Sequence, residues 1–156
     1  MKFFSTLTRS NWVKLPLFAC GIVSLTLVPA KAQAPYQGKS KSVQIETLAE
    51  GGVSWDHVPY KAYPSAPPRL SVLKITLPPH SALPWHIHGI PVAVYVLSGK
   101  LIIEKESGEK KEANAGQAVL ETVNSIHRGK TGNSSAELIV FYAGALGLPL
   151  AKTVQR

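Results

Sequence analysis

The sequence predicts an all-β domain, built as a sandwich or barrel of short strands. Short apolar runs recur along residues 69–144, and glycine and proline residues lie between them. No segment keeps the apolar period of about 3.6 residues that marks an amphipathic helix. No internal repeat and no second domain are indicated, so we expect one all-β domain.

We expect strands over residues 69–77, within residues 92–106 and over residues 136–144. The first range (RLSVLKITL) alternates apolar with other residues, as a strand with one buried face does. The second range is typical of two strands joined by a tight turn at Gly99. The third (AELIVFYAG) is rich in β-branched and aromatic residues and is bounded by glycine.

Residues 56–68 (DHVPYKAYPSAPP) contain too many prolines for a regular strand. We expect an ordered loop that wraps the domain. Burial of the aromatic rings of Trp55, Tyr60 and Tyr63 would hold this loop in place.

Residues 1–32 have the three parts of a secretory signal peptide: basic residues, an apolar run and small residues before a cleavage site. Ala30 and Ala32 fit the small-residue rule, so we expect cleavage after Ala32, with cleavage after Ala34 as the alternative. The protein is then exported to the periplasm or out of the cell.

Two other interpretations of this segment remain open. An uncleaved membrane anchor is disfavoured because the apolar run falls short of the roughly 20 residues that span a bilayer. Lipid anchoring at Cys20 is disfavoured because this cysteine lies inside the apolar run and not at its end. After cleavage we therefore expect no stable membrane span.

The remainder divides into a flexible mature N-terminus, residues 33–42, and the β-barrel domain, residues 43–156. The chain has 17 Lys+Arg and 9 Asp+Glu, but four of the basic residues lie in the signal. The formal net charge of the mature chain is therefore 13 − 9 = +4. No cluster of basic residues in it is interleaved with aromatic residues. We expect no nucleic-acid partner. Residues 33–156 contain no cysteine, which excludes disulfides and thiol chemistry there.

The most informative motif is PWHIHG, at residues 84–89. In a strand, side chains two positions apart lie on the same face, about 6.6 Å apart. The imidazoles of His86 and His88 can therefore converge on one metal ion. The alternative is a pair of surface histidines, because a His-x-His pair alone is a weak signal.

The surroundings of this pair resemble the two motifs of the cupin superfamily. The first motif contains a His-x-His pair and ends in glycine, and the second begins with glycine and ends in a single histidine. In this resemblance His86 and His88 match the pair, Gly99 the closing glycine, Gly116 the opening glycine and His127 the single histidine.

The resemblance covers most of residues 69–143. It implies a single-domain cupin jelly-roll β-barrel with one divalent metal ion on His86, His88 and His127. The stretch ETVNSIHRG and the segment VFYAG at residues 140–144 also resemble a group of small exported cupins.

Two positions depart from the cupin pattern. Val92 stands where the first motif has an acidic residue, and Thr122 stands where the second motif usually has proline. We expect Glu121 to replace the missing acid as a fourth ligand, because a carboxylate inside a barrel needs a cation or a metal ion. The alternative is that Glu121 points to solvent, since strand alternation alone does not decide its direction.

Two further residues are candidates for substrate binding. Arg128 follows His127 directly and can hold a carboxylate through two hydrogen bonds. Tyr95 is an aromatic candidate for the lining of the pocket. The other interpretation makes Arg128 a surface residue and Tyr95 a core residue.

Three imidazoles and a carboxylate suit iron, manganese, zinc, copper or nickel. With coordination positions left open, such an ion supports chemistry on a small organic molecule, and a metal-dependent dioxygenase is our first expectation. The alternatives are a Lewis-acid isomerase or lyase, and a non-catalytic periplasmic protein that binds a metal or small ligand. Barrels of this kind commonly pair through edge strands, so we also expect a homodimer.

Overall fold

The computed structural model describes residues 43–155 of the chain. The predicted signal peptide, the lipid-anchoring alternative at Cys20 and the predicted flexible segment 33–42 lie outside the described residues. Within them, the structure contains strands and no helix, and hence no helix that could cross a membrane.

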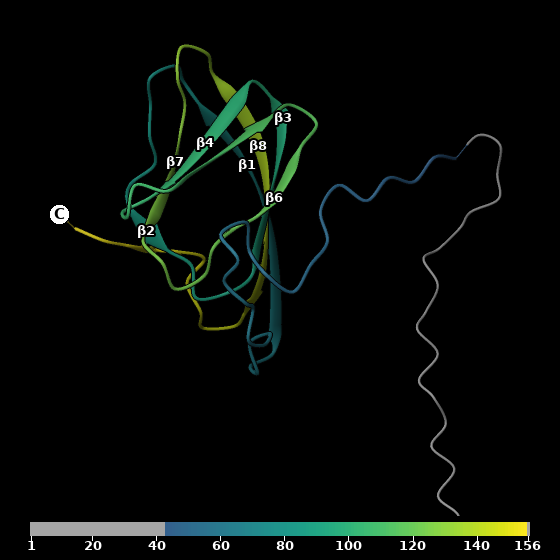
Figure 1. Ribbon diagram of the computed structural model, residues 1–156. Helices are drawn as coiled ribbons and strands as arrows, with labels where there is room; N and C mark the ends of the chain where they lie inside the picture. Colours follow the sequence, from purple (N-terminus) through teal and green to yellow (C-terminus); the bar gives the residue numbers. More distant parts are fainter. Residues whose placement is uncertain (1–42, 156) are drawn as a thin grey trace, which may run out of the picture. The chain divides into compact units, whose positions relative to one another are not determined.

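The strands form two antiparallel sheets, and neighbours in each sheet are often distant in sequence (Figure 1). In spatial order, the first sheet contains β1 (Pro68–Leu77), β8 (Ala136–Ala145), β3 (Val92–Ser98) and β6 (Ala118–Leu120). The second contains β5 (Lys110–Asn114), β4 (Lys100–Lys105), β7 (His127–Lys130), β2 (His86–Ile87) and β9 (Lys152–Thr153). The chain crosses repeatedly between the sheets, which is the jelly-roll arrangement predicted from the sequence.

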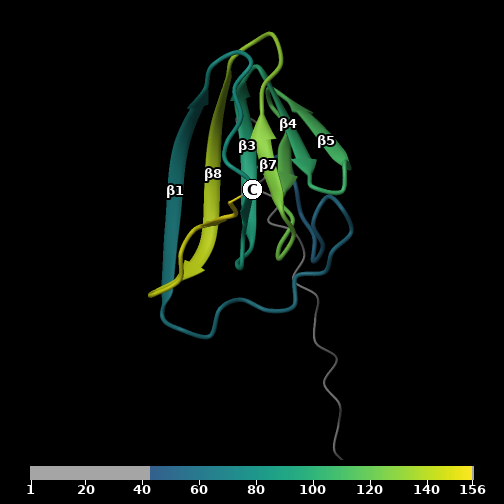
Figure 2. The same cartoon turned by 90° about the vertical axis from the view of Figure 1, so that its left-hand side faces the viewer.

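The two sheets face each other, and the apolar core lies between them (Figure 2). Along β3 and β8, buried residues alternate with more exposed ones, because successive side chains of a strand point to opposite faces. The buried core consists of Leu77, Ile90, Val92, Val94, Val96, Leu101, Ile103, Ala113, Val119, Ala136, Leu138, Val140 and Tyr142.

The predicted turn at Gly99 is present, but it does not close a paired hairpin. Strands β3 and β4 on its two sides belong to different sheets, so the turn carries the chain from one sheet to the other. Gly99 has a φ of +75°, and a Cβ atom there would lie 1.9 Å from the carbonyl oxygen of Ser135. Only glycine fits this crossing.

The loop over residues 56–68 is irregular, as predicted, and strand β1 begins at its end. Trp55 packs against the core, and the hydroxyl of Tyr60 donates a hydrogen bond to the backbone of Glu121. The prediction was wrong for Tyr63, whose side chain is exposed. It lines a surface pocket together with Leu70 and Phe141.

An ion-pair cluster lies on the outer face of the second sheet. The buried carboxylate of Glu104 accepts a hydrogen bond of 2.6 Å from Arg128 Nε and also pairs with Lys130. The guanidinium of Arg128 lies over the ring of Trp85, 4.3 Å from its centre. Burial alone would raise the pKa of Glu104, but hydrogen bonds from Lys130 and Arg128 outweigh it and lower the pKa.

We expect Glu104→Gln to lower the free energy of unfolding by about 2 kcal/mol at pH 7, because a charged hydrogen-bond acceptor is lost. The folded-state pKa of Glu104 lies below its ordinary value of 4.5, so its contribution is complete above that pH. The contribution disappears as the pH falls through the folded-state pKa. Urea unfolding at pH 7 and at pH 3 should therefore show a difference between wild type and variant that shrinks in acid. An equal difference at both pH values would contradict this account.

Candidate metal centre

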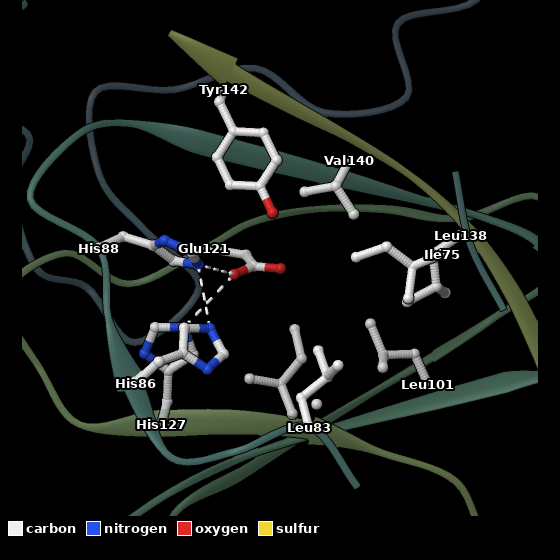
Figure 3. Close-up of a pocket in the computed structure, with 12 residues that line it drawn as sticks. Ile75, Leu83, His86, His88, Leu101, Glu121, His127, Leu138, Val140 and Tyr142 are labelled. Atoms are coloured by element: carbon white, nitrogen blue, oxygen red, sulfur yellow. Dashed lines mark hydrogen bonds and ion pairs between the residues drawn. The ribbon is translucent and has the colours of Figure 1, made fainter. Parts of the chain in front are cut away.

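The structure brings His86, His88, Glu121 and His127 together at one end of the barrel interior (Figure 3). Each offers one ligand atom, and these four atoms lie within 4.8 Å of one another. Among the described residues, this is the one group of His, Cys, Asp and Glu side chains with such an arrangement.

The elements place three of the four residues without strain. His86 in β2 lies directly opposite His127 in the neighbouring strand β7. His88 lies two residues after His86 and therefore projects from the same side of the chain. His88 and His127 are buried, and His86 is half-buried.

Glu121 reaches the site from outside any strand, since β6 ends at Leu120 and β7 begins at His127. Its side chain is buried, so the alternative in which it points to solvent does not hold. Its Oε2 atom lies 3.1 Å from His88 Nε2 and 3.3 Å from His127 Nε2.

Backbone carbonyls fix the orientation of all three imidazole rings. The Nδ1 atoms of His86, His88 and His127 lie 2.8, 2.7 and 2.8 Å from the carbonyl oxygens of Pro84, Leu150 and Ser125. A carbonyl oxygen can only accept, so each Nδ1 must carry the proton and donate it. In the neutral rings, the lone pairs are then on the Nε2 atoms, which face the centre.

The four ligand atoms can together bind one cation. In the neutral rings they have no hydrogen-bond donor among themselves. The Nε2 atoms of His86 and His88 lie 3.2 Å apart, and the Glu121 carboxylate lies beside them. In the neutral rings these atoms are all acceptors, so they need a bound proton, a donor such as water, or a metal ion to satisfy them. Ligand atoms that share a metal ion at about 2.1 Å are roughly 3 Å apart. The Nε2 atoms of His86 and His88 are 3.2 Å apart, and Glu121 Oε2 lies 3.1 and 3.3 Å from those of His88 and His127, which is close to this value, while the whole set lies within 4.8 Å. The residues therefore fit a divalent transition metal.

The electrostatics of the site keep the carboxylate ionised. Burial alone would raise the pKa of Glu121, but hydrogen bonds with His127 and His88 lower it to about 2. Burial lowers the pKa of His86, which favours the neutral ring that a metal ion requires. For His127 burial also lowers the pKa, but the hydrogen bonds with Glu121 and the Ser125 carbonyl and the negative charges of Glu121 and Asp56 together outweigh it, so the pKa is raised. A metal ion would therefore compete with a proton at His127.

A small cavity of about 30 Å³ adjoins the four residues. Its other walls are apolar and come from both sheets: Ile75, Leu83, Leu101, Ile103, Gly129, Leu138, Val140 and Tyr142. About 10–15 Å³ of such space is enough for one water molecule, so the cavity holds only a very small ligand as it stands.

The hydroxyl of Tyr142 points into this cavity (Figure 3). Burial, followed by the negative charge of Glu121, raises the pKa of Tyr142 to about 12, so the phenol stays protonated and can donate. The sequence alone does not distinguish Tyr142 from Trp85, Tyr95 and Phe141 as the aromatic residue that lines the pocket. The pattern in the sequence that indicates its direction is the alternation along β8, which places Leu138, Val140 and Tyr142 on one buried face.

The structure does not bring Arg128 or Tyr95 to this site. Arg128 is next to His127 in β7 and so points to the opposite face, where Glu104 and Trp85 bind its guanidinium. Tyr95 lies between the buried residues Val94 and Val96 of β3 and so projects from the outer face of the first sheet. Neither side chain lines the cavity.

A family model described as a cupin domain matches residues 73–142. No curated protein matches the sequence. Similar solved structures include the DMSP lyase DddQ from Ruegeria pomeroyi DSS-3, at 18% identity and a TM-score of 0.48, covering 55% of this chain and 43% of that one. Another is the polyketide cyclase RemF from Streptomyces resistomycificus, at 20% identity and a TM-score of 0.49, covering 59% and 64%. The chain thus spans less than two thirds of either protein, and neither likeness bears on its function.

Proposed function

We propose that this chain, whose residues 73–142 form a cupin domain, is an exported protein that binds one divalent transition-metal ion and acts there on a small organic molecule. His86, His88, His127 and Glu121 would be its ligands. One observation carries the proposal: a buried carboxylate and three oriented Nε2 atoms converge with nothing but each other as partners among the described residues.

The donor set narrows the choice of metal. Imidazole nitrogens suit iron, copper, nickel and zinc, and the added carboxylate extends the range to manganese. When bound, such an ion would supply an open coordination position for polarising or oxidising a substrate. A metal-dependent dioxygenase remains the first proposal, and a Lewis-acid isomerase or lyase is the alternative for an ion without redox chemistry.

The chain's own residues limit the substrate. The cavity of about 30 Å³ admits only a few atoms, so a large ring system cannot enter without movement of the apolar walls. The neutral phenol of Tyr142 can donate a hydrogen bond to an oxygen of the bound molecule. We therefore favour a small oxygen-bearing substrate. The same narrow cavity also favours a second candidate, a non-catalytic protein that holds a metal ion with a very small ligand.

The first prediction concerns metal content. Protein purified without an affinity tag should carry about one equivalent of metal by elemental mass spectrometry, and His86→Ala and His127→Ala should lose most of it. Glu121→Gln should weaken binding, because the neutral amide is a poorer ligand. Iron, copper, manganese or nickel would support the dioxygenase, and zinc the alternatives. A folded protein that contains no metal and takes up none would overturn the proposal.

A second prediction tests whether Tyr142 contacts the bound small molecule without being a metal ligand. Tyr142→Phe should leave Co²⁺ affinity unchanged and weaken the binding of azide to the Co²⁺-loaded protein by about five-fold, the loss expected for one hydrogen bond. The Co²⁺ absorption spectrum reports both events. Equal azide affinity in wild type and variant would show that the hydroxyl does not contact the bound ligand.

We also propose a homodimer formed through the outer side of β1, which is the edge strand of its sheet. Leu70 and Val72 project there with 65% and 63% exposure, beside Phe141 at 38%, and a second copy would bury this apolar face. Light scattering after size exclusion should give a dimer for wild type and a monomer for the double variant Leu70→Lys and Val72→Lys. A wild-type monomer at micromolar concentration would contradict the proposal.

A further inference from the structure

Glu121 depends on neighbouring segments for its position, because it does not itself belong to a strand. The Glu121 amide donates to the Val92 carbonyl at 2.9 Å, which ties it to the first sheet. The other contacts come from residues 53–60, a segment we call the strap. Within the strap, the Trp55 amide donates to the Leu120 carbonyl at 2.9 Å, and the Tyr60 hydroxyl donates to the Glu121 carbonyl at 2.6 Å.

Asp56 is the central residue of the strap. Its side chain is fully buried, and its two oxygens accept hydrogen bonds from three groups. Ser54 Oγ donates to Oδ1 at 2.5 Å, Thr122 Oγ1 donates to Oδ2 at 2.9 Å, and Lys105 Nζ lies 2.7 Å from Oδ2. Thr122 is itself fully buried and follows Glu121 directly. The Asp56 carboxylate therefore holds the residue next to the ligand.

Asp56 also connects Glu121 to the sheet that carries the histidines. Lys105 is the last residue of β4 and lies directly opposite His127 in β7. One carboxylate thus joins the segment of Glu121 to the strand beside His127. Burial alone would raise the pKa of Asp56, but hydrogen bonds from Lys105, Ser54 and Thr122 outweigh it and lower the pKa, so the carboxylate is charged at neutral pH.

We propose that Asp56 is a positioning residue for the metal centre: through Thr122 and Lys105 it fixes Glu121 where its carboxylate meets the three histidines. This inference rests on the proposed metal site. If Asp56 only stabilised the fold, replacing it would have the same effect whether or not Glu121 is a ligand. A positioning role acts on metal affinity only through Glu121.

A double-mutant cycle on the full-length chain separates the two roles, with Co²⁺ alone as the probe. Asp56→Asn leaves one acceptor oxygen where three donors now converge, and should weaken Co²⁺ binding by roughly 10- to 100-fold, the range for partners that orient metal ligands. In the Glu121→Gln background, Asp56→Asn should cause no further loss, because the ligand that it positions is already absent.

Two controls distinguish a specific loss of Co²⁺ affinity from a general loss of folding. Glu104→Gln removes a buried, ion-paired carboxylate from the neighbouring position of β4, and its side chain does not contact the site. It should lower stability and leave Co²⁺ affinity unchanged. Thr122→Val should weaken Co²⁺ binding because it removes the donor to Asp56, and Thr122→Ser should retain wild-type affinity because it keeps the hydroxyl.

The outcomes distinguish this inference from the proposed function. If wild type does not bind Co²⁺, the metal site fails and the positioning role fails with it. If wild type binds Co²⁺ and Glu121→Gln weakens binding, but Asp56→Asn does not, only the positioning role is overturned. Additive losses in the double variant, or equal losses in Thr122→Val and Thr122→Ser, would overturn it as well.

Discussion

The structure of the site depends on one constraint: a negative charge is buried beside three imidazole rings whose Nε2 atoms, in the neutral rings, carry lone pairs and no proton. The three backbone carbonyls hold the Nδ1 protons of the histidines, so the Nε2 lone pairs and the Glu121 carboxylate share one small space. Removal of a charge from water is costly unless an opposite charge lies close by. A bound cation would complete this arrangement, and the geometry is therefore typical of a binding site and not of an apolar core.

The buried carboxylates of Glu104 and Glu121 lie on opposite sides of the second sheet and have different partners. On the outer face of the second sheet, Glu104 is satisfied by Arg128 and Lys130, and nothing is left for a ligand. On the inner side, Glu121 has only histidines as partners. Arg128 and His127 are consecutive residues of β7, so one strand contributes to both. The alternation of a single strand thus separates an ion pair from the candidate metal centre.

The parts of the site that lie on strands were predictable, and the part that lies between strands was not. The spacing of His86 and His88 predicted a shared face, and the resemblance to the cupin motifs added His127. The same alternation would have excluded Arg128 and Tyr95, since each adjoins a residue expected to face inward. Glu121 belongs to the irregular segment before β7, where alternation has no meaning. The contacts of this segment come from residues distant in sequence that carry no motif: Tyr60 donates to the Glu121 carbonyl, and Asp56 accepts from Thr122, the next residue.

The hydrogen bond between the His88 ring and the Leu150 carbonyl limits how short a fragment can be and still keep the site intact. All four candidate ligands lie within the cupin match of residues 73–142, but the carbonyl of Leu150 that orients His88 lies beyond it, and the strap with Asp56 lies before it. A fragment cut at those boundaries would keep every ligand and lose the framework that aims two of them. Grafting this centre onto another barrel would therefore require both flanking segments.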